Sequence, residues 1–182
     1  VTIAHQDDLY DECYVEKMLN YLNIEKKPLI YFTDYNEIRN GEKVETNKLL
    51  RIKRIMLFPL KFRIFWNSKF IRRRILSLGS PICCPSVTYV KENLMNPIFM
   101  NHFRTNEDWE AWENISKLDG AFVYCSKPLT FHRIHEESET SAAISETGRA
   151  EEDLVMYRKF WPTWIARILT KLYGNSEKSN QL

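Results

Sequence analysis

Pro28-Leu-Ile-Tyr-Phe-Thr-Asp34 holds an unbroken apolar run between a proline and an aspartate. A short run with such boundaries is typical of a strand buried on both faces of a sheet, so we predict a strand over Leu29–Thr33. Two further apolar runs, Val1–Ala4 and Gly120–Tyr124, are predicted as strands. The dipeptide Asn40-Gly41 follows the first run and favours a turn there.

Helical periodicity separates these strands. In Tyr14–Leu22, apolar residues recur at the spacing of one helix face, namely at Val15, Met18, Leu19 and Leu22. Further helices are predicted over Lys48–Leu57, Ser68–Leu78 and Asn106–Leu118. Strands that alternate with helices indicate an α/β domain.

The end of the chain is predicted to be helical. After a polar stretch from Glu136 to Thr147, two helices are expected on either side of Pro162, and Asn175–Leu182 is predicted to be disordered. The last helix carries an apolar face formed by Trp164, Ile165, Ile168, Leu169 and Leu172. That face docks on the domain, pairs with another subunit or lies in a bilayer interface, and we favour docking. The predicted parts are residues 1–145, 146–174 and 175–182.

Two adjacent carboxylates, Asp7 and Asp8, follow the first apolar run. Neighbouring anions repel each other unless a cation or hydrogen bonds compensate. A hard divalent ion such as Mg²⁺ or Mn²⁺, carrying a diphosphate, is one interpretation. The alternative is that the pair caps the helix that begins near Glu12.

Composition is that of a globular protein. The chain has 182 residues, of which 44% are hydrophobic, so it can bury one core. No stretch reaches the roughly 18 apolar residues of a spanning helix and no signal peptide begins the chain, so we expect a soluble or membrane-peripheral protein. The cysteines have no CxxC spacing and are predicted to be buried free thiols in a reducing compartment: Cys13, Cys83, Cys84 and Cys125.

The central third of the chain is strongly basic. Between Glu45 and Glu92 there are eleven Lys and Arg residues and no acidic residue, interleaved with six apolar residues: Met56, Phe58, Phe62, Phe65, Trp66 and Phe70. This combination suits an anionic membrane surface, a lipid-linked phosphate or a nucleic-acid backbone. The simpler interpretation is a helix pair whose aromatics face the core while the charged ends reach into water. Together with residues 160–173, residues 48–76 are our candidates for peripheral membrane contact. We expect no nucleic-acid partner, because no motif for one is present.

Several separated segments are similar, in the same order, to motifs of one enzyme family. They are Val1–Tyr10 with its acidic pair, Pro28–Tyr35, Pro81-Ile-Cys-Cys-Pro-Ser86, Asn106-Glu-Asp-Trp-Glu-Ala-Trp112 and His132-Arg-Ile-His-Glu-Glu-Ser138. They resemble, respectively, the acidic D-x-D-D strand end, the next strand, the acceptor-facing loop, the E-D-W helix start and the R-x-H segment of the family 2 glycosyltransferases. The first acidic position of that pattern is occupied here by His5, which is a departure.

The resemblance implies a GT-A-like, Rossmann-like α/β fold with a mixed sheet flanked by helices and a helical C-terminal tail. It also implies that the donor-binding strand-helix-strand unit is missing before Val1. The implied activity is transfer of a sugar, with inversion, from a nucleotide-diphosphate donor to a saccharide or lipid-linked acceptor in cell-surface polysaccharide synthesis. The expected location is the cytoplasm, with the inner face of the membrane as an alternative.

The resemblance also implies roles for particular residues. Asp108 matches the catalytic base of the E-D motif, in the first turn of a helix where the dipole favours the ionised form. The same placement also fits an ordinary acidic residue at a helix start. Asp7 and Asp8 match ligands of the divalent ion. Arg133 is implied as a phosphate contact and His135 as a metal or phosphate ligand, and an imidazole ligand favours Mn²⁺ over Mg²⁺. The alternative function is a non-catalytic basic binding module on the same fold.

Overall fold

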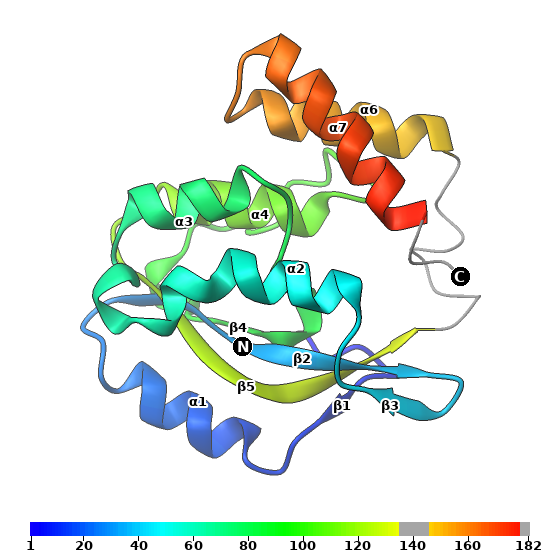
Figure 1. Ribbon diagram of the computed structural model, residues 1–182. Coiled ribbons are helices and arrows are strands. Elements are labelled where there is room, and N and C mark those ends of the chain that lie inside the picture. Colours follow the sequence, from blue (N-terminus) through cyan, green and yellow to red (C-terminus); the bar gives the residue numbers. More distant parts are fainter. Residues whose placement is uncertain (135–145, 179–182) are drawn as a thin grey trace.

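The computed structural model describes residues 1–134 and 146–178, which form a curled mixed sheet with helices on both faces (Figure 1). The strands are β1 (Leu9–Tyr10), β2 (Pro28–Arg39), β3 (Glu42–Val44), β4 (Val87–Tyr89) and β5 (Ala121–Ile134). The α-helices are α1 (Tyr14–Leu22), α2 (Lys48–Leu57), α3 (Lys69–Leu76), α4 (Glu107–Ser116), α6 (Glu146–Arg158) and α7 (Thr163–Lys178). The 3-10 turns are η1 (Phe58–Lys61), η2 (Arg63–Phe65), η3 (Cys84–Ser86) and η4 (Lys91–Asn93). The prediction of an α/β fold is therefore confirmed.

The elements form layers. Helix α1 covers one face of the sheet, α2, α3 and α4 cover the other, and α6 and α7 lie outside α3 and α4 (Figure 1). The strand order is β1-β5-β2-β3, with β4 on the same edge of β2 as β3. Met156, Tyr157 and Ala166 belong to the same hydrophobic cluster as the sheet residues, so α6 and α7 share its core.

The centre of the sheet is the parallel pairing of β2 with β5. The register begins at Pro28 opposite Ala121 and ends at Arg39 opposite Ile134. It shifts after Thr33, which lies opposite Cys125, whereas the next residue of β2 lies opposite Pro128. The extra residues on β5 mark a bulge, and bulges bend the strand that carries them. The second halves of both strands therefore run on as a separate, curled part of the sheet.

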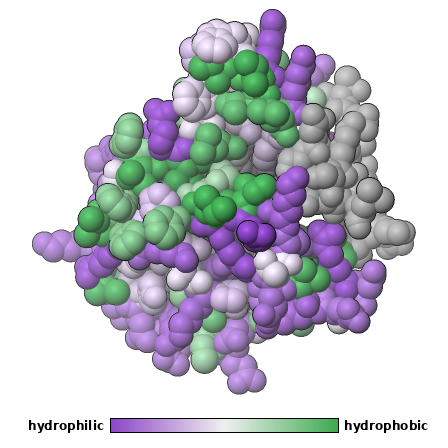
Figure 2. Space-filling model, in the orientation of Figure 1, coloured by the Kyte–Doolittle hydropathy of each residue, from purple (hydrophilic) through white to green (hydrophobic). Residues whose placement is uncertain are grey.

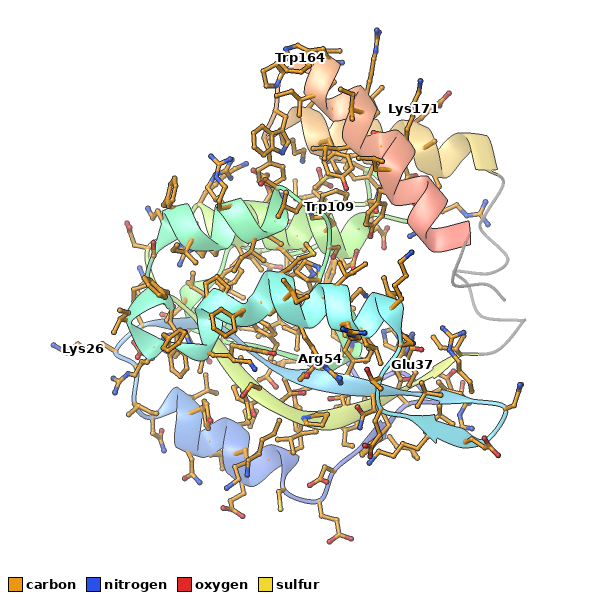
Figure 3. All side chains as sticks on the ribbon, in the orientation of Figure 1. Lys26, Glu37, Arg54, Trp109, Trp164 and Lys171 are labelled. Carbon is orange, nitrogen blue, oxygen red and sulfur yellow. The ribbon has the colours of Figure 1, made fainter. Side chains whose placement is uncertain are left out.

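The strand predicted over Leu29–Thr33 is confirmed, but it continues to Arg39. Its second half contains buried polar residues, which hid it from a search for apolar runs. Arg54 of α2 provides partners, because its guanidinium donates to Asp34 Oδ2 at 2.7 Å and to Asn36 Oδ1 at 3.1 Å. Glu37 accepts a 2.8 Å hydrogen bond from the side chain of Asn47, the N-cap of α2 (Figure 3). These bonds allow polar residues to be buried in the strand.

The strand predicted over Val1–Ala4 is wrong. Within this run, only Thr2 pairs with the sheet, through an isolated bridge to Thr88. Ile3 is exposed, so the run is not packed against the core as a strand. The turn at Asn40-Gly41 is confirmed, because both residues have positive φ and join β2 to β3. The predicted bounds of α1 and α2 are confirmed. Residue Ser68 caps α3 through its side chain instead of lying inside the helix.

The predicted apolar faces of two helices are only partly the buried ones. In α1, Val15 and Leu19 are exposed, while Tyr14 is buried and packs against Tyr31 of β2. In α7, Trp164, Ile168 and Leu172 are exposed, and the helix docks through Ala166 and through Tyr173, whose ring meets Trp109 (Figure 3). Docking of α7 is therefore confirmed, through a face rotated from the predicted one. The helix continues to Lys178, into the tail predicted to be disordered.

Both tryptophans of α4 are core residues. Trp109 and Trp112 are fully buried. Among the cysteines, Cys83 and Cys125 are buried, whereas Cys84 is half-buried and Cys13 is exposed, so the prediction of burial was wrong for Cys13.

A buried arginine closes the carboxyl end of α4. The Arg72 guanidinium donates to the backbone carbonyls of Ser116, Leu118 and Gly120, and it lies 5.0 Å from the centre of the Phe122 ring. Burial lowers the pKa of Arg72 to about 10, so the side chain stays charged at neutral pH. One side chain thus provides a donor for the last carbonyl of α4 and for two carbonyls of the segment that leads into β5.

We expect Arg72→Met to lower the free energy of unfolding by about 3 kcal/mol, because several buried carbonyls lose their donor. Arg74→Met, on the exposed side of the same helix, is the matched control and should cost less than about 1 kcal/mol, the scale of its ring contacts. Urea denaturation of both variants measures the difference. Equal losses would show that Arg72 contributes no more than a surface arginine.

Candidate functional site

The site begins where β1 meets the end of β5. The Asp8 side chain is fully buried there, and its Oδ1 accepts hydrogen bonds from the backbone N–H of Arg133 at 2.9 Å and from His132 Nδ1 at 3.0 Å. The Arg133 Nε donates to the backbone carbonyl of Asp7 at 3.0 Å. Three of the predicted site residues are thus brought together, and the bonds tie β1 onto β5. Residue His135 lies outside the described residues.

The roles of the two carboxylates differ. Both oxygens of Asp8 face protein groups, since Oδ2 lies 3.2 Å from His132 Nδ1 and 3.8 Å from His5 Nδ1. A metal ion at Asp8 would have to displace these partners, so the observed geometry suits an anchor better than a ligand. Asp7 is half-buried and is the carboxylate of the pair better placed to reach a ligand. Within residues 1–134 and 146–178, no group of three or more His, Cys, Asp or Glu side chains could hold a metal ion.

The segment Pro81–Ser86 borders the same region. The Tyr10 hydroxyl donates to the carbonyl of Pro85 at 2.6 Å, and the Tyr14 hydroxyl donates to the carbonyl of Ser86 at 3.0 Å. Two tyrosines from β1 and α1 therefore hold turn η3 in place. The turn presents Cys83 and Cys84 next to the acidic segment.

Asp108 lies in the first turn of α4 and is half-buried. Its Oδ1 accepts from the backbone N–H of Trp109 at 2.6 Å. Burial raises the pKa of Asp108, and the Trp109 amide and the charge of Lys53 oppose the rise. A base whose pKa lies closer to neutrality than that of an ordinary aspartate accepts a proton more readily, so the environment is suited to general base chemistry.

Helix α6 positions the start of α4. The Glu152 carboxylate accepts from the backbone N–H groups of Arg104, Thr105 and Asn106 at 2.9 to 3.2 Å. The Asn106 side chain donates to Asp153 at 2.8 Å. The loop before Asp108 is thus held by two neighbouring carboxylates of one helix. This clamp was not predicted, because nothing in the local pattern relates residues that are about 46 positions apart.

Lys53 is a site residue that the sequence analysis missed. Its Nζ donates to the Tyr35 hydroxyl at 3.0 Å and lies 5.3 Å from the centre of that ring. Burial raises the pKa of Tyr35 to about 12, so the phenol is neutral and can accept this bond. The Tyr35 ring in turn meets the ring of His132, with centres 6.4 Å apart. A signal was present, since Lys53 shares the buried face of α2 with Leu50 and Leu57.

The charges of the two acidic segments both act on the thiols of Cys83 and Cys84. Burial raises the pKa of the Cys84 thiol to about 12, and the charges of Asp108 and Asp8 add to the rise. Burial also raises the pKa of the Cys83 thiol. The negative charges of Asp8 and Asp108 raise this pKa further, whereas the positive charge of Lys53 lowers it. Both thiols are therefore protonated at neutral pH and are poor nucleophiles. The two aspartates, 100 positions apart, act on the same pair of thiols.

The site contains the Asp108 carboxylate, which is suited to accept a proton, and the Lys53 ammonium group. It also contains the acidic pair Asp7-Asp8 and the turn Pro81–Ser86. Such an arrangement can bind an anionic ligand beside the base and take a proton from a hydroxyl group.

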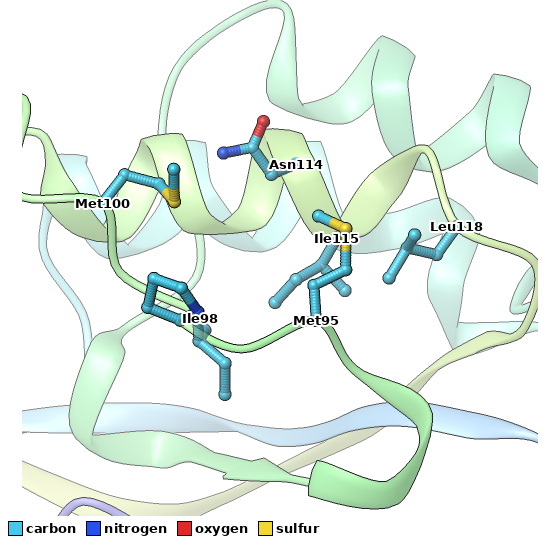
Figure 4. Close-up of a pocket in the computed structure, with 7 residues that line it drawn as sticks. Met95, Ile98, Met100, Asn114, Ile115 and Leu118 are labelled. Atoms are coloured by element: carbon cyan, nitrogen blue, oxygen red, sulfur yellow. The ribbon is translucent and has the colours of Figure 1, made fainter.

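A separate apolar pocket lies between α4 and the loop before it (Figure 4). It is lined by Met95, Pro97, Ile98, Met100, Asn114, Ile115 and Leu118. Its cavity volume of about 20 Å³ has room for little more than a water molecule, so it is no site for a sugar or a nucleotide.

Comparisons of the chain with models of protein families, with curated proteins and with solved structures found no match.

We expect Asp8→Ala to lower the free energy of unfolding by about 2 kcal/mol, because the Arg133 amide and the His132 ring lose their acceptor. Glu12→Ala removes an exposed carboxylate from the same segment and should change little. Urea denaturation is run with Mn²⁺ and with a chelator. A loss seen only with Mn²⁺ would identify Asp8 as a metal ligand instead of an anchor.

Asp108→Asn is expected to stabilise the protein at neutral pH. Because the pKa of Asp108 is raised above its ordinary value of 3.8, the wild type loses stability as the pH rises from that value through the folded-state pKa, and the loss persists above it. The amide cannot ionise, so the variant avoids this loss. Its advantage in urea denaturation should be present at pH 7 and disappear near pH 4.

Glu107→Gln is the control, since it removes a neighbouring carboxylate from the same helical turn. A variant at Asp108 that is no more stable than wild type at pH 7 would contradict the raised pKa of this carboxylate in the folded protein.

Proposed function

We propose that the chain belongs to a GT-A-like, inverting glycosyltransferase that resembles family 2. It would move a sugar from a nucleotide-diphosphate donor to a saccharide or lipid-linked acceptor in cell-surface polysaccharide synthesis. The observation that supports this best is the grouping of Asp8, the Pro81–Ser86 turn and Asp108 around the same thiols. These three segments are separated in sequence, and each carries a motif of the resemblance.

Asp108 is the proposed base. It would take the proton from an acceptor hydroxyl while that oxygen bonds to the anomeric carbon and the bond from that carbon to the diphosphate breaks. The raised pKa of Asp108, caused by burial, supports this role. Glu152 of α6 binds the backbone just before Asp108, which restricts the movement of the base relative to the acceptor.

The donor diphosphate is assigned to the region of Asp7 and Arg133. Arg133 is held against the Asp7 carbonyl, which places a guanidinium at the end of β5. Mn²⁺ or Mg²⁺, when bound, would supply positive charge for the departing diphosphate. Of the described carboxylates at this position, Asp7 would hold the ion, with His135 as a further ligand predicted outside the described residues. Lys53 would add a fixed positive charge near Asp108.

A second candidate is a non-catalytic basic binding module. Two observations favour it: His5 replaces the first acidic position of the motif, and the Asp8 carboxylate is used by His132 and Arg133. The proposed site of action in either case is the cytoplasm, with the inner face of the membrane as an alternative.

Turnover distinguishes the two candidates. Release of nucleoside diphosphate is measured over a panel of nucleotide sugars with Mn²⁺, with any sequence encoded upstream of Val1 included in the protein. Asp108→Asn should lower kcat by about 10² to 10⁴-fold, the usual contribution of a general base, and leave KM for the donor nearly unchanged. Glu107→Gln, the matched control, should keep most of the activity.

Loss of Mn²⁺-dependent donor binding in calorimetry is expected for Asp7→Ala. No turnover and no donor binding in the wild type would favour the binding module. Equal activity of the Asp108→Asn and wild-type proteins would remove Asp108 as the base.

A further inference from the structure

The basic central segment exposes some of its large apolar side chains and buries others. The interpretation that its aromatics face the core holds for Trp66, which is 4% exposed, but is wrong for others. The outward-facing set over α2, η1, η2 and α3 consists of Ile55, Phe58, Phe62, Ile64 and Phe70, which are between 50% and 80% exposed. We call this set the apolar patch. Contiguous exposed patches of this kind mark interaction surfaces in soluble proteins.

Two aromatic members of the patch are in contact, and cations lie against the patch rings. The Phe58 and Phe62 rings have centres 5.6 Å apart, and Lys61 lies 5.9 Å from the Phe58 ring. On α3, Arg74 lies 5.5 Å from the Phe70 ring. Figure 2 shows hydrophobic side chains gathered over α2, the 3-10 turns and α3, and again over α7 on the same face. From α7, the exposed Trp164, Ile168 and Leu172 extend this face.

Some of the positively charged side chains of the segment form ion pairs with acidic residues of the protein. Arg54 pairs with Asp34, Arg63 with Glu25, and Arg73 with Glu113. Around the patch, Lys48, Arg51 and Lys61 have no ion pair in the part of the chain that the structure describes. The patch is therefore apolar at its centre and cationic at its border, and residues 46–91 include no acidic side chain.

We propose that this face binds an anionic lipid surface, with the patch side chains inserted between head groups and Lys48, Arg51 and Lys61 in contact with lipid phosphates. Aromatic and aliphatic side chains bordered by Lys and Arg are the composition of interfacial binding surfaces. No helix in the described part of the chain is long and apolar enough to cross a membrane. The inference goes beyond the proposed activity and does not depend on it.

Two other occupants fit less well. In a symmetric dimer through this face, the cationic borders of the two copies would meet, and like charges would oppose association. A nucleic acid would use the cations and stack on the aromatics, but it has no use for the aliphatic Ile55 and Ile64, which are 72% and 80% exposed. Acyl chains accommodate both kinds of side chain.

The test is vesicle flotation of the whole chain. Vesicles of phosphatidylcholine alone are compared with vesicles of phosphatidylcholine and phosphatidylglycerol in a roughly 3:1 ratio. We expect binding to the anionic vesicles only, weakened by salt. Ile64→Ser/Phe70→Ser should lower the bound fraction at least about tenfold in partition coefficient, because two large apolar side chains no longer insert. Lys48→Gln/Arg51→Gln/Lys61→Gln should remove the preference for anionic lipid.

The matched control is Val15→Ser/Leu19→Ser, which removes two exposed apolar side chains from α1 on the opposite face of the sheet (Figure 1). It should bind as the wild type does, and urea denaturation must show that all variants stay folded. Equal binding to both vesicle types, binding unaffected by the patch substitutions, or no vesicle binding would overturn the proposal. So would self-association or DNA binding that depends on the patch while vesicle binding is absent.

Discussion

The parallel pairing of β2 with β5 is the constraint on which the rest of the structure depends. Parallel neighbours require a crossover, and here the crossover contains α2, α3, β4 and α4. Because β2 is buried along most of its length, the polar residues in its second half need partners from the crossover, and Arg54 donates to two of them. The bulge opposite Thr33 then curls the strand ends toward β1, where Asp8 bonds to β5.

The charged side chains that are buried in this protein differ in how completely other groups of the protein compensate their charge. Arg72 and Asp8 have a full set of protein partners, so their burial connects elements of the fold. Asp108 has a pKa that burial raises, although the Trp109 amide and the charge of Lys53 oppose the rise. Such incomplete compensation costs stability and is common where a side chain acts on a ligand. This contrast supports the interpretation that Asp108 acts on a ligand and that Asp8 anchors β1 to β5.

The basic segment shows why composition alone could not assign its surface. Arginines such as Arg54 and Arg72 point inward to carboxylates and carbonyls, whereas Phe62 and Phe70 point outward. A helix pattern predicts that there is an apolar face, but α1 and α7 bury faces rotated from the apparent ones. Which face is buried depends on the neighbour, and here large polar-tipped rings such as Tyr14 and Tyr173 fill the contacts.

Local pattern was sufficient for the existence of most elements. The buried run of β2, the turn at Asn40-Gly41, the bounds of α1 and α2 and the α/β class all follow from periodicity and turn chemistry within a few residues. Only the tertiary structure decided the length of β2 and β5, the bond of Asp8 to Arg133, and the place of Lys53 beside Tyr35. The physical reason is that these features depend on partners about 20 to 125 positions away in the chain, and nothing in the spacing of neighbouring residues records which distant group will satisfy a buried charge.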